Sequence, residues 1–213
     1  MAGVKDIEVK VIPSKIANSF IQKHHYSGKV VPNSSLHFGA FLDGKLHGVM
    51  SYGASINKKG TMNLVAGTGW NEFLELNRMA FDDYLPKNSE SRCIGVSLRL
   101  IKKNAPHIKW VISFADGTQC GDGAIYRASN FVLTDIRKND ALRINPETGE
   151  KVHTITAYHA MNKDFKNWKP LDGYQLRYIY FIDKDMRKNL TVPEIPFSEI
   201  AKQGATMYKG VKK

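Results

Sequence analysis

The stretch that decides the fold is KWVISFADGTQCGDGAIYRASNFVLTDI, residues 109–136. Its first eight residues form an apolar run typical of a strand buried on both faces, and residues 131–136 form a second strand pattern. Between them lies a short helical pattern over residues 124–129, which ends at Asn130, a residue that tolerates the left-handed conformation of a helix C-cap. The stretch therefore predicts a strand, a short helix and another strand in succession.

The chain before this stretch supplies more strands and two longer helices. Residues 73–81 alternate apolar and polar side chains as a strand does, and a helical pattern follows the break at residues 86–88 and continues to about Asn104. Nearer the N-terminus the pattern predicts a strand over 7–12, a helix over 14–23, and a hairpin over 36–54 with its turn at Asp43-Gly44. The fold class is therefore α/β, with a mixed central sheet and helices on both faces.

The last third of the chain is more polar. Residues 137–150 are expected to form a surface loop, and VHTITAYHA (152–160) and YQLRYIYFI (174–182) are candidate strands. We expect one domain over residues 1–183, followed by a loosely packed basic extension over residues 184–213.

The composition favours a polyanionic partner. The 31 Lys and Arg exceed the 20 Asp and Glu by eleven charges, so DNA, RNA or an anionic cofactor would be attracted. Only Cys93 and Cys120 occur, too few for a disulfide framework, and no apolar run approaches the roughly 20 residues that span a bilayer. These features predict a cytoplasmic protein that does not enter a membrane.

Two short motifs could carry chemistry. Residues 92–97, RCIGVS, precede a predicted helix, and Gly95 would let a phosphate approach the free N–H groups of a helix N-terminus; an ordinary helix start with one glycine is the alternative. Tyr126 lies in the short helix before Asn130 and can donate a proton. Together the motifs resemble the acetyl-CoA-type N-acyltransferase (GNAT) superfamily, with its R/Q-x-x-G-x-G/A donor loop and its Y-x-x-x-G-F helix. The sequence departs from that pattern at Ser97 and Asn130.

A longer resemblance covers most of the chain. The blocks HHYSGKVVPNS (24–34), WNEFLELNRMAFDDYLPKNSESR (70–92) and SLRLIKKNAPHIKWVISFADGTQCGDGAIYRASNF (97–131) are similar to the Mom family of bacteriophage DNA modification proteins. The resemblance implies an enzyme in the host bacterial cytoplasm. It would add a two-carbon, amide-bearing group, carbamoylmethyl or the isomeric glycyl, to the exocyclic N6 amine of adenine in duplex DNA and so protect the DNA from restriction.

The resemblance also assigns residues. The catalytic set it implies is His25, Tyr26, Arg78, Asp116 and Tyr126, and the donor-binding set is Ser91, Arg92, Gly95 and Ser97. Asp116 or His25 would remove a proton from the amine, Tyr26 or Tyr126 would protonate the leaving group, and Arg78 would stabilise an oxyanion or hold a phosphate. The structural alternatives are an ion pair for Arg78, a capping role for Asp116 and a core position for Tyr126.

Several partners stay open on sequence grounds. The donor is either an acyl-CoA or an aminoacyl-tRNA such as glycyl-tRNA, and His24, His25 and Asp116 have the ligand types of a nonheme iron site. The target base must leave the duplex stack, with Tyr26, Trp70 or Phe38 to receive it, while Lys184, Arg187 and Lys188 follow the phosphate backbone. A tRNA partner and a homodimer are also open. The rival interpretation is a catalytically inactive DNA-binding regulator with the same fold.

Overall fold

The computed structural model describes residues 3–118, 120–139, 141–159, 164–208 and 211–212. The chain forms two compact units, and each is described by itself. The first unit comprises Met1–Phe114, Ala124–Thr134 and Tyr178–Glu194, and the second comprises Ala115–Gly123, Asp135–Arg177 and Ile195–Lys213. This division differs from the expected boundary after residue 183.

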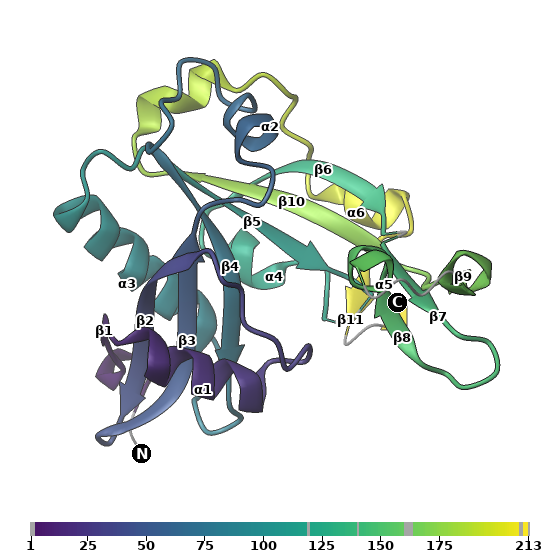
Figure 1. Ribbon diagram of the computed structural model, residues 1–213. Coiled ribbons are helices and arrows are strands. Elements are labelled where there is room, and N and C mark those ends of the chain that lie inside the picture. Colours follow the sequence, from purple (N-terminus) through teal and green to yellow (C-terminus); the bar gives the residue numbers. More distant parts are fainter. Residues whose placement is uncertain (1–2, 119, 140, 160–163, 209–210, 213) are drawn as a thin grey trace. The chain divides into compact units, whose positions relative to one another are not determined.

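A seven-stranded sheet has the order β1-β2-β3-β4-β5-β10-β6 (Figure 1). Its strands are β1 (Glu8–Val11), β2 (Ser34–Leu42), β3 (Lys45–Gly53), β4 (Phe73–Phe81), β5 (Trp110–Asp116), β6 (Val132–Lys138) and β10 (Tyr174–Phe181). Neighbours from β1 to β4 are antiparallel, whereas β4 and β5 are parallel. The sheet is therefore mixed, as the sequence predicts.

The hairpin of β2 and β3 turns where the sequence predicts. Asp43 and Gly44 have φ values of 50° and 74°. Positive φ at both central residues of a two-residue loop is the requirement of a type I′ turn, whose twist matches that of the two strands. Asp-Gly is a favoured pair for this turn, so a local signal sufficed here.

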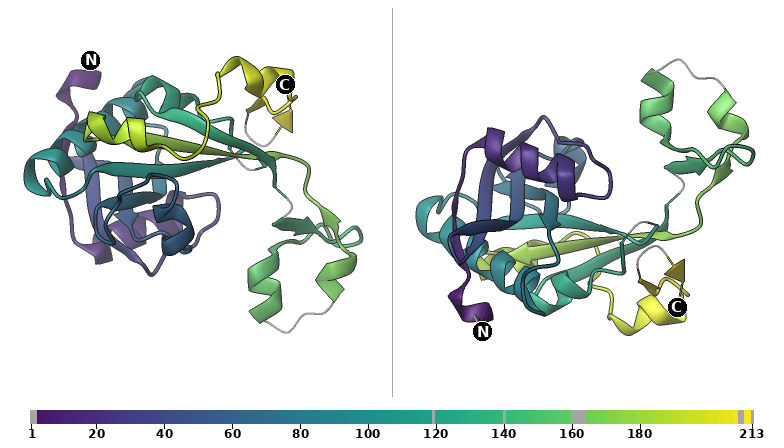
Figure 2. Two further views of the ribbon diagram at one scale, coloured as in Figure 1. Left: turned by 90° about the horizontal axis from the view of Figure 1, so that it is seen from above. Right: turned by 90° about the horizontal axis from the view of Figure 1, so that it is seen from below.

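Helices cover both faces of the sheet (Figures 1 and 2). The helix α1 (Ser14–His24) buries Ala17 and Ile21 against Val49 of β3. Because successive side chains of a strand point to opposite faces, Tyr52 faces the other way, and its hydroxyl lies 2.6 Å from that of Ser97 on α3 (Ser89–Asn104). The remaining helices of the first unit are α2 (Lys58–Met62), α4 (Ala124–Ala128), and the 3-10 helices η1 (Val4–Asp6) and η3 (Lys184–Asn189).

The segment after residue 183 begins as part of the core of the first unit. Met186 and Leu190 pack against a buried cluster that includes Trp110 and Phe181, and Leu190 also bridges to Val65. The partial burial of these apolar side chains stabilises the position of the segment. The expectation of a loosely packed tail is therefore wrong for residues 184–194.

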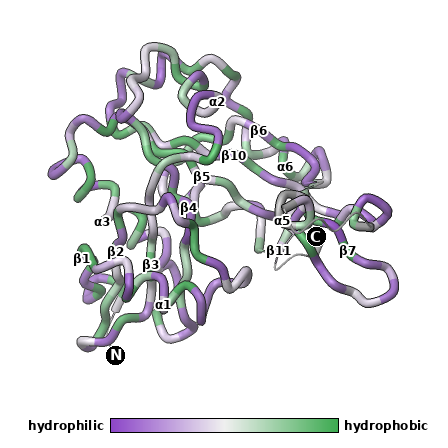
Figure 3. Tube along the Cα trace, in the orientation of Figure 1, coloured by the Kyte–Doolittle hydropathy of each residue, from purple (hydrophilic) through white to green (hydrophobic). Residues whose placement is uncertain are grey.

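The second unit corrects two further expectations. The expected strand 152–160 is a short β8 (Lys151–His153) followed by the helix α5 (Thr154–His159), and Ala157 of that helix packs with Phe165 and Trp168. The expected loop 137–150 contains β7 (Leu142–Ile144), although the segment that joins β7 to β8 is hydrophilic (Figure 3). Packing against aromatic neighbours overrides the strand preference of Thr and Ile here.

The second unit contains parts of β5, β6 and β10 of the seven-stranded sheet, and it also contains small sheets of its own. One has the order β8-β7-β9, with β9 at Lys169–Pro170, and the other pairs β11 (Met207–Tyr208) with β12 (Val211–Lys212). The 3-10 helix η2 (Asp164–Asn167) and α6 (Ser198–Lys202) complete this unit. Among the described residues of the whole chain, no helix has both the length and the apolar character needed to cross a membrane.

Candidate active site

The candidate site lies where β4 and β5 stop pairing. Their parallel register starts at Phe73 and Trp110 and ends at Glu75 opposite Ile112, although β4 continues to Phe81 (Figure 1). On its other edge β4 has a bulge at Asn77, since Tyr52 pairs with Leu76 and the preceding residue of β3 pairs with Arg78. Such bulges reorient side chains and are common next to active sites. We call this region the strand divergence.

Glu75 is the last residue of β4 that pairs with β5, so it lies at the strand divergence. Its carboxyl lies close enough to the Ser55 hydroxyl and to Arg78 for both to affect its pKa. Burial raises its pKa, while the Ser55 hydrogen bond and the charge of Arg78 act in the opposite direction. Sequence reasoning missed this residue. The only signal was a carboxylate on the predicted strand over residues 73–81, three residues before Arg78.

His25 follows directly after α1. Burial and, to a smaller extent, the charge of Arg78 lower its pKa from 6.5 to about 4, so the ring is neutral at pH 7. Its Nδ1 accepts a hydrogen bond from the Ser27 N–H at 3.2 Å and lies 2.8 Å from the Ser27 hydroxyl. From this pattern we assign the ring proton to Nε2. The arrangement favours His25 as a hydrogen-bond donor rather than as a base.

Arg78 connects β4 to the loop that follows α1. Its Nε donates to the Lys29 carbonyl at 3.2 Å and one terminal nitrogen donates to the Asn77 carbonyl at 2.8 Å. The same loop is fixed to β4 a second time, because the Ser34 hydroxyl donates to the Asn77 side chain at 2.8 Å. Both bonds of Arg78 go to neutral carbonyls, so its positive charge stays available to the strand divergence.

The aromatic residues expected to receive an extruded base differ in exposure. Tyr26 is 53% exposed and packs on the His25 ring at 4.2 Å between centroids, and Trp70 is 56% exposed. Phe38 is buried, with its ring edge against Tyr52. The expectation is therefore wrong for Phe38, which is a core residue.

Tyr126 on α4 is buried, and its hydroxyl points to the strand divergence. Ser113 of β5 donates to the Leu76 carbonyl at 3.1 Å and lies 2.9 Å from the Tyr126 hydroxyl. The Ser113 hydroxyl thus links the Tyr126 hydroxyl to the backbone of β4. The ring packs against Phe131 and Tyr178. The Tyr126 ring is therefore part of the core, which was the structural alternative for this residue. Its hydroxyl is connected to β4 through Ser113.

The end of α4 explains one departure from the superfamily pattern. Asn130 has φ of 62°, the Phe131 N–H donates to the Tyr126 carbonyl at 3.0 Å, and the Asn130 N–H donates to the Arg127 carbonyl at 3.1 Å. These two bonds define a Schellman motif, in which glycine usually occupies the left-handed position. Asn130 takes that position here, as the sequence predicts.

The expected donor loop is part of a helix. Because α3 begins at Ser89, right after the break at residues 86–88, Gly95 and Ser97 lie beyond its first turn and not at its start. Ser97 is fully buried and donates to the Ile94 carbonyl at 2.8 Å. The predicted position of Gly95 and Ser97 at the free helix N-terminus is therefore wrong.

Ser91 and Arg92 do lie in the first turn of α3. The Ser91 carbonyl is 3.3 Å from the Ser129 hydroxyl at the end of α4, so the start of α3 and the Tyr126 helix are adjacent. One terminal nitrogen of Arg92 donates to the Lys5 carbonyl, and its Nε is buried without a hydrogen-bond partner among the described residues. A buried guanidinium N–H of this kind suits an anionic oxygen.

Asp116 belongs to the second unit, and its carboxylate is hydrogen-bonded to residues of that unit. One carboxylate oxygen accepts from the Thr118 N–H at 3.0 Å, from the Thr118 hydroxyl, and from the Asn139 amide at 2.9 Å. This is the geometry of the capping role given above as its alternative. A proposed catalytic role for Asp116 draws no support from these contacts.

The iron site that His24, His25 and Asp116 suggested is not formed. His24 stacks on Phe20 at 4.3 Å between ring centroids. Throughout the described part of the chain, no group of three or more His, Cys, Asp or Glu side chains is arranged to hold a metal ion.

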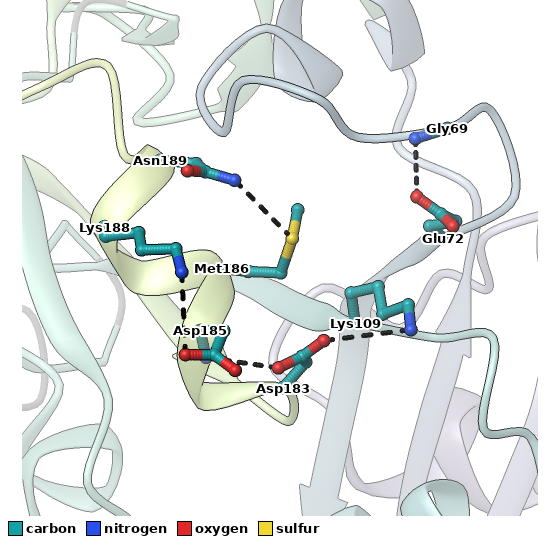
Figure 4. A network of polar contacts seen from close by, with 8 residues as sticks. All are labelled: Gly69, Glu72, Lys109, Asp183, Asp185, Met186, Lys188 and Asn189. Atoms are coloured by element: carbon teal, nitrogen blue, oxygen red, sulfur yellow. Dashed lines mark hydrogen bonds and ion pairs between the residues drawn. The ribbon is translucent and has the colours of Figure 1, made fainter.

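The basic residues expected to bind DNA after residue 183 are partly neutralised. Arg187 forms two hydrogen bonds with Glu194, at 2.6 and 2.5 Å, and Lys188 lies 3.7 Å from Asp185 (Figure 4). Lys184 lies over the Tyr180 ring at 4.5 Å. Their role toward DNA stays a prediction.

The fold and the helices around the strand divergence define the class of protein. The polyamine N-acetyltransferase of Drosophila melanogaster superposes with a TM-score of 0.50 over 83% of this chain and all of that one, at 10% identity. A GNAT family acetyltransferase from Elizabethkingia anophelis with acetyl-CoA bound gives a TM-score of 0.48 over 83% of this chain and 98% of that one, at 13% identity. The chain has the fold of the GNAT acetyltransferases.

The particular family follows from sequence comparison. The model of the Mom protein family matches residues 6–199. The methylcarbamoylase Mom of Escherichia phage Mu is 36% identical over 200 residues, which cover 88% of this chain and 80% of that protein. The chain belongs to the Mom protein family, which confirms the resemblance seen in the sequence.

Proposed function

We propose that the chain is a transferase that adds a two-carbon, amide-bearing group to the exocyclic N6 amine of adenine in duplex DNA and so protects the DNA from restriction. Membership of the Mom family supports this proposal, as does the name of its phage Mu relative, a methylcarbamoylase. The observation that carries it is the position of Glu75 and Arg78 on β4 at the strand divergence, with Arg78 bound to the loop that follows His25.

In the proposed step, Glu75 is the base. The lone pair of the exocyclic amine is delocalised into the purine ring, so the amine must lose a proton as it attacks. The bond from N6 to carbon forms, the bond from that carbon to the leaving group breaks, and the N6 proton passes to the Glu75 carboxylate. A carboxylate with a raised pKa is better matched to this task than one with an ordinary pKa.

The other groups handle charge and the leaving group. Arg78 and the Nε2–H of His25 supply a cation and a neutral donor for the negative charge that develops on the transferred group. The Tyr126 hydroxyl, which lies beside Ser113, returns a proton to the departing group. These assignments replace the expected base roles of His25 and Asp116.

The donor would supply the two-carbon unit in activated form. We propose that Arg92 and the first turn of α3 bind its phosphate groups, because the Arg92 Nε is buried and lacks a partner among the described residues. An acyl-CoA and an aminoacyl-tRNA such as glycyl-tRNA both carry phosphates, and the surplus of eleven positive charges suits the larger polyanion as well. Separate supply of each donor to the purified chain and duplex DNA will identify the one that yields product.

Mass spectrometry of nucleosides from cells that express the chain tests the proposal. We expect a deoxyadenosine heavier by C2H3NO, and fragmentation should place the added group on the base. The methylcarbamoyl, carbamoylmethyl and glycyl groups are isomers, so the fragments and not the mass distinguish them. If abundant, folded protein leaves every nucleoside unmodified while duplex DNA still binds, the chain is the inactive DNA-binding regulator instead.

A further inference from the structure

The loop between β3 and α2, residues 54–57, presents an apolar side chain at its tip. Ile56 is 84% exposed, more than any other large apolar residue that the structure describes. Hydrogen bonds fix both of its neighbours. Ser55 is buried, and its hydroxyl lies 2.9 Å from the Thr61 hydroxyl. The Asn57 side chain caps α2 by accepting a hydrogen bond from the Gly60 N–H at 3.1 Å. Because both neighbours of Ile56 are fixed in this way, the loop presents the isoleucine side chain to solvent at a defined position.

The loop is close to the proposed reaction centre. Ser55, next to Ile56, is one of the groups that lower the pKa of Glu75. Ala54 accepts from the Asn77 amide at 3.4 Å, and its N–H donates to the Asn33 carbonyl at 3.3 Å, which joins the loop to β4 and to the segment after α1. Ile56 therefore follows, by two residues, the Ala54 carbonyl that contacts Asn77 in the bulge of β4.

Positive charge and an aromatic ring surround the tip. Lys59 is exposed, and Lys58 lies over the Trp70 ring at 4.4 Å while its ammonium donates to Asn71 at 3.2 Å. Trp70 itself is more than half exposed. An apolar tip with flanking lysines is complementary to a nucleic acid duplex, whose phosphates lie outside and whose base stack lies inside.

We propose that residues 54–59 form the segment that opens the duplex: Ile56 enters the base stack beside the target adenine while Lys59 contacts a flanking phosphate. This inference rests on the proposed function. An enzyme that acts on N6 must extrude the base, at a cost of a few kcal/mol, and an inserted apolar side chain replaces the lost stacking contacts. Ile56 is thus a residue for access to the base and takes no part in the bond-forming step.

The test compares paired with unpaired adenine as substrate. The full-length chain and its Ile56→Ala variant are assayed, in a cell extract that supplies the donor, on a linear duplex and on the same DNA with a bubble of unpaired adenines. We expect Ile56→Ala to lower modification of the duplex at least about tenfold and to leave that of the bubble within about twofold, because unstacking costs are paid only in the duplex. Ile56→Phe, a larger wedge, should retain activity on both.

Ile16→Ala is the matched control, since it makes the same change at another exposed isoleucine, on α1. An equal loss on duplex and bubble, or no loss on either, would overturn the inference while leaving the proposed function intact. If the unaltered chain modified neither substrate, the proposed function itself would fail, and the two failures are therefore distinguishable.

The proposed contact between Lys59 and a DNA phosphate is tested by a separate measurement. Lys59→Gln should weaken binding to a duplex of any sequence and reduce the slope of log affinity against log salt by about 0.9, the value for one lost phosphate contact. The control is Lys45→Gln, an exposed lysine beside the turn at the opposite end of β3. Equal slopes for the two variants would exclude Lys59 from the DNA contact.

Discussion

His25 and Glu75 show how burial sets protonation at the scale of the residue. Burial disfavours the charged form of both, so the pKa of the imidazole falls and that of the carboxyl rises, and Arg78 lowers both pKa values. A neutral imidazole that donates from Nε2 and a carboxylate of increased basicity are the complementary groups that an attacking amine needs. The sequence indicated His25 and Arg78 by family motif. It did not indicate Glu75, because no local pattern shows that Ser55 and Arg78 will lie beside that carboxylate.

The protonation of His25 is directly measurable. Its pKa of about 4 lies below the unperturbed 6.5, so we expect no titration of its ring signals between pH 5 and 8 in an NMR titration. The folded protein should lose stability from this group as the pH falls below 6.5 and through about 4, since the unfolded state binds the proton more tightly. Arg78→Gln removes a charge that lowers the pKa and should raise it, though burial will keep it below 6.5. An unchanged pKa in Arg78→Gln would show that the two side chains do not interact.

Replacing Glu75 by glutamine should change the stability of the protein and its activity in different ways. Its folded-state pKa is raised, so its contribution to stability is lost as the pH rises from the unfolded value near 4.5 through the folded value. Glu75→Gln cannot ionise and should unfold in urea at the same or a higher midpoint than the unaltered chain at pH 8, although it removes the proposed base. A marked destabilisation of Glu75→Gln would instead assign Glu75 a structural role.

At the scale of the element, local signals succeeded where a turn or cap chemistry fixed the backbone. The Asp43-Gly44 turn and the left-handed Asn130 were both predicted from the residues concerned and are present in the structure. Prediction failed where distant contacts decide: α5 forms in place of a strand because Ala157 packs with Phe165 and Trp168. The helical pattern after residues 86–88 did predict the start of α3, and the motif-based position of Gly95 and Ser97 at a helix N-terminus was inconsistent with that pattern. The bulge at Asn77 and the end of the β4–β5 register also depend on neighbouring strands, so sequence periodicity could not show them.

The cap of α4 gives a prediction at this scale. Asn130→Ala places a Cβ-bearing residue without a compensating side chain in the left-handed region and should lower the free energy of unfolding by about 1 kcal/mol, whereas Asn130→Gly should be neutral or stabilising. Urea denaturation of the two variants measures the difference. The opposite order of stability would contradict the Schellman assignment.

At the scale of the whole molecule, the α/β class was predictable because strand and helix patterns alternate along the chain, while the GNAT fold was expected from the resemblance of two short motifs. The division into two compact units was not predictable, since three long strands, β5, β6 and β10, each contribute residues to both units. The surplus of eleven positive charges indicated a polyanion, and duplex DNA is the polyanion of the proposed function. The net charge could not indicate which segment contacts DNA. The proposal for residues 54–59 depends instead on the exposure of Ile56 in the structure.

The central claim is that this chain modifies adenine by means of Glu75 at the strand divergence. The measurement that tests it most directly is the amount of modified deoxyadenosine in DNA from cells that express the unaltered chain, Glu75→Gln or the control Glu72→Gln at equal protein levels. We predict the heavier nucleoside with the unaltered chain and with Glu72→Gln, and a decrease of about a hundredfold or more with Glu75→Gln, as expected for loss of a general base. Equal amounts from all three proteins, or no modified deoxyadenosine from the unaltered chain, would contradict the claim.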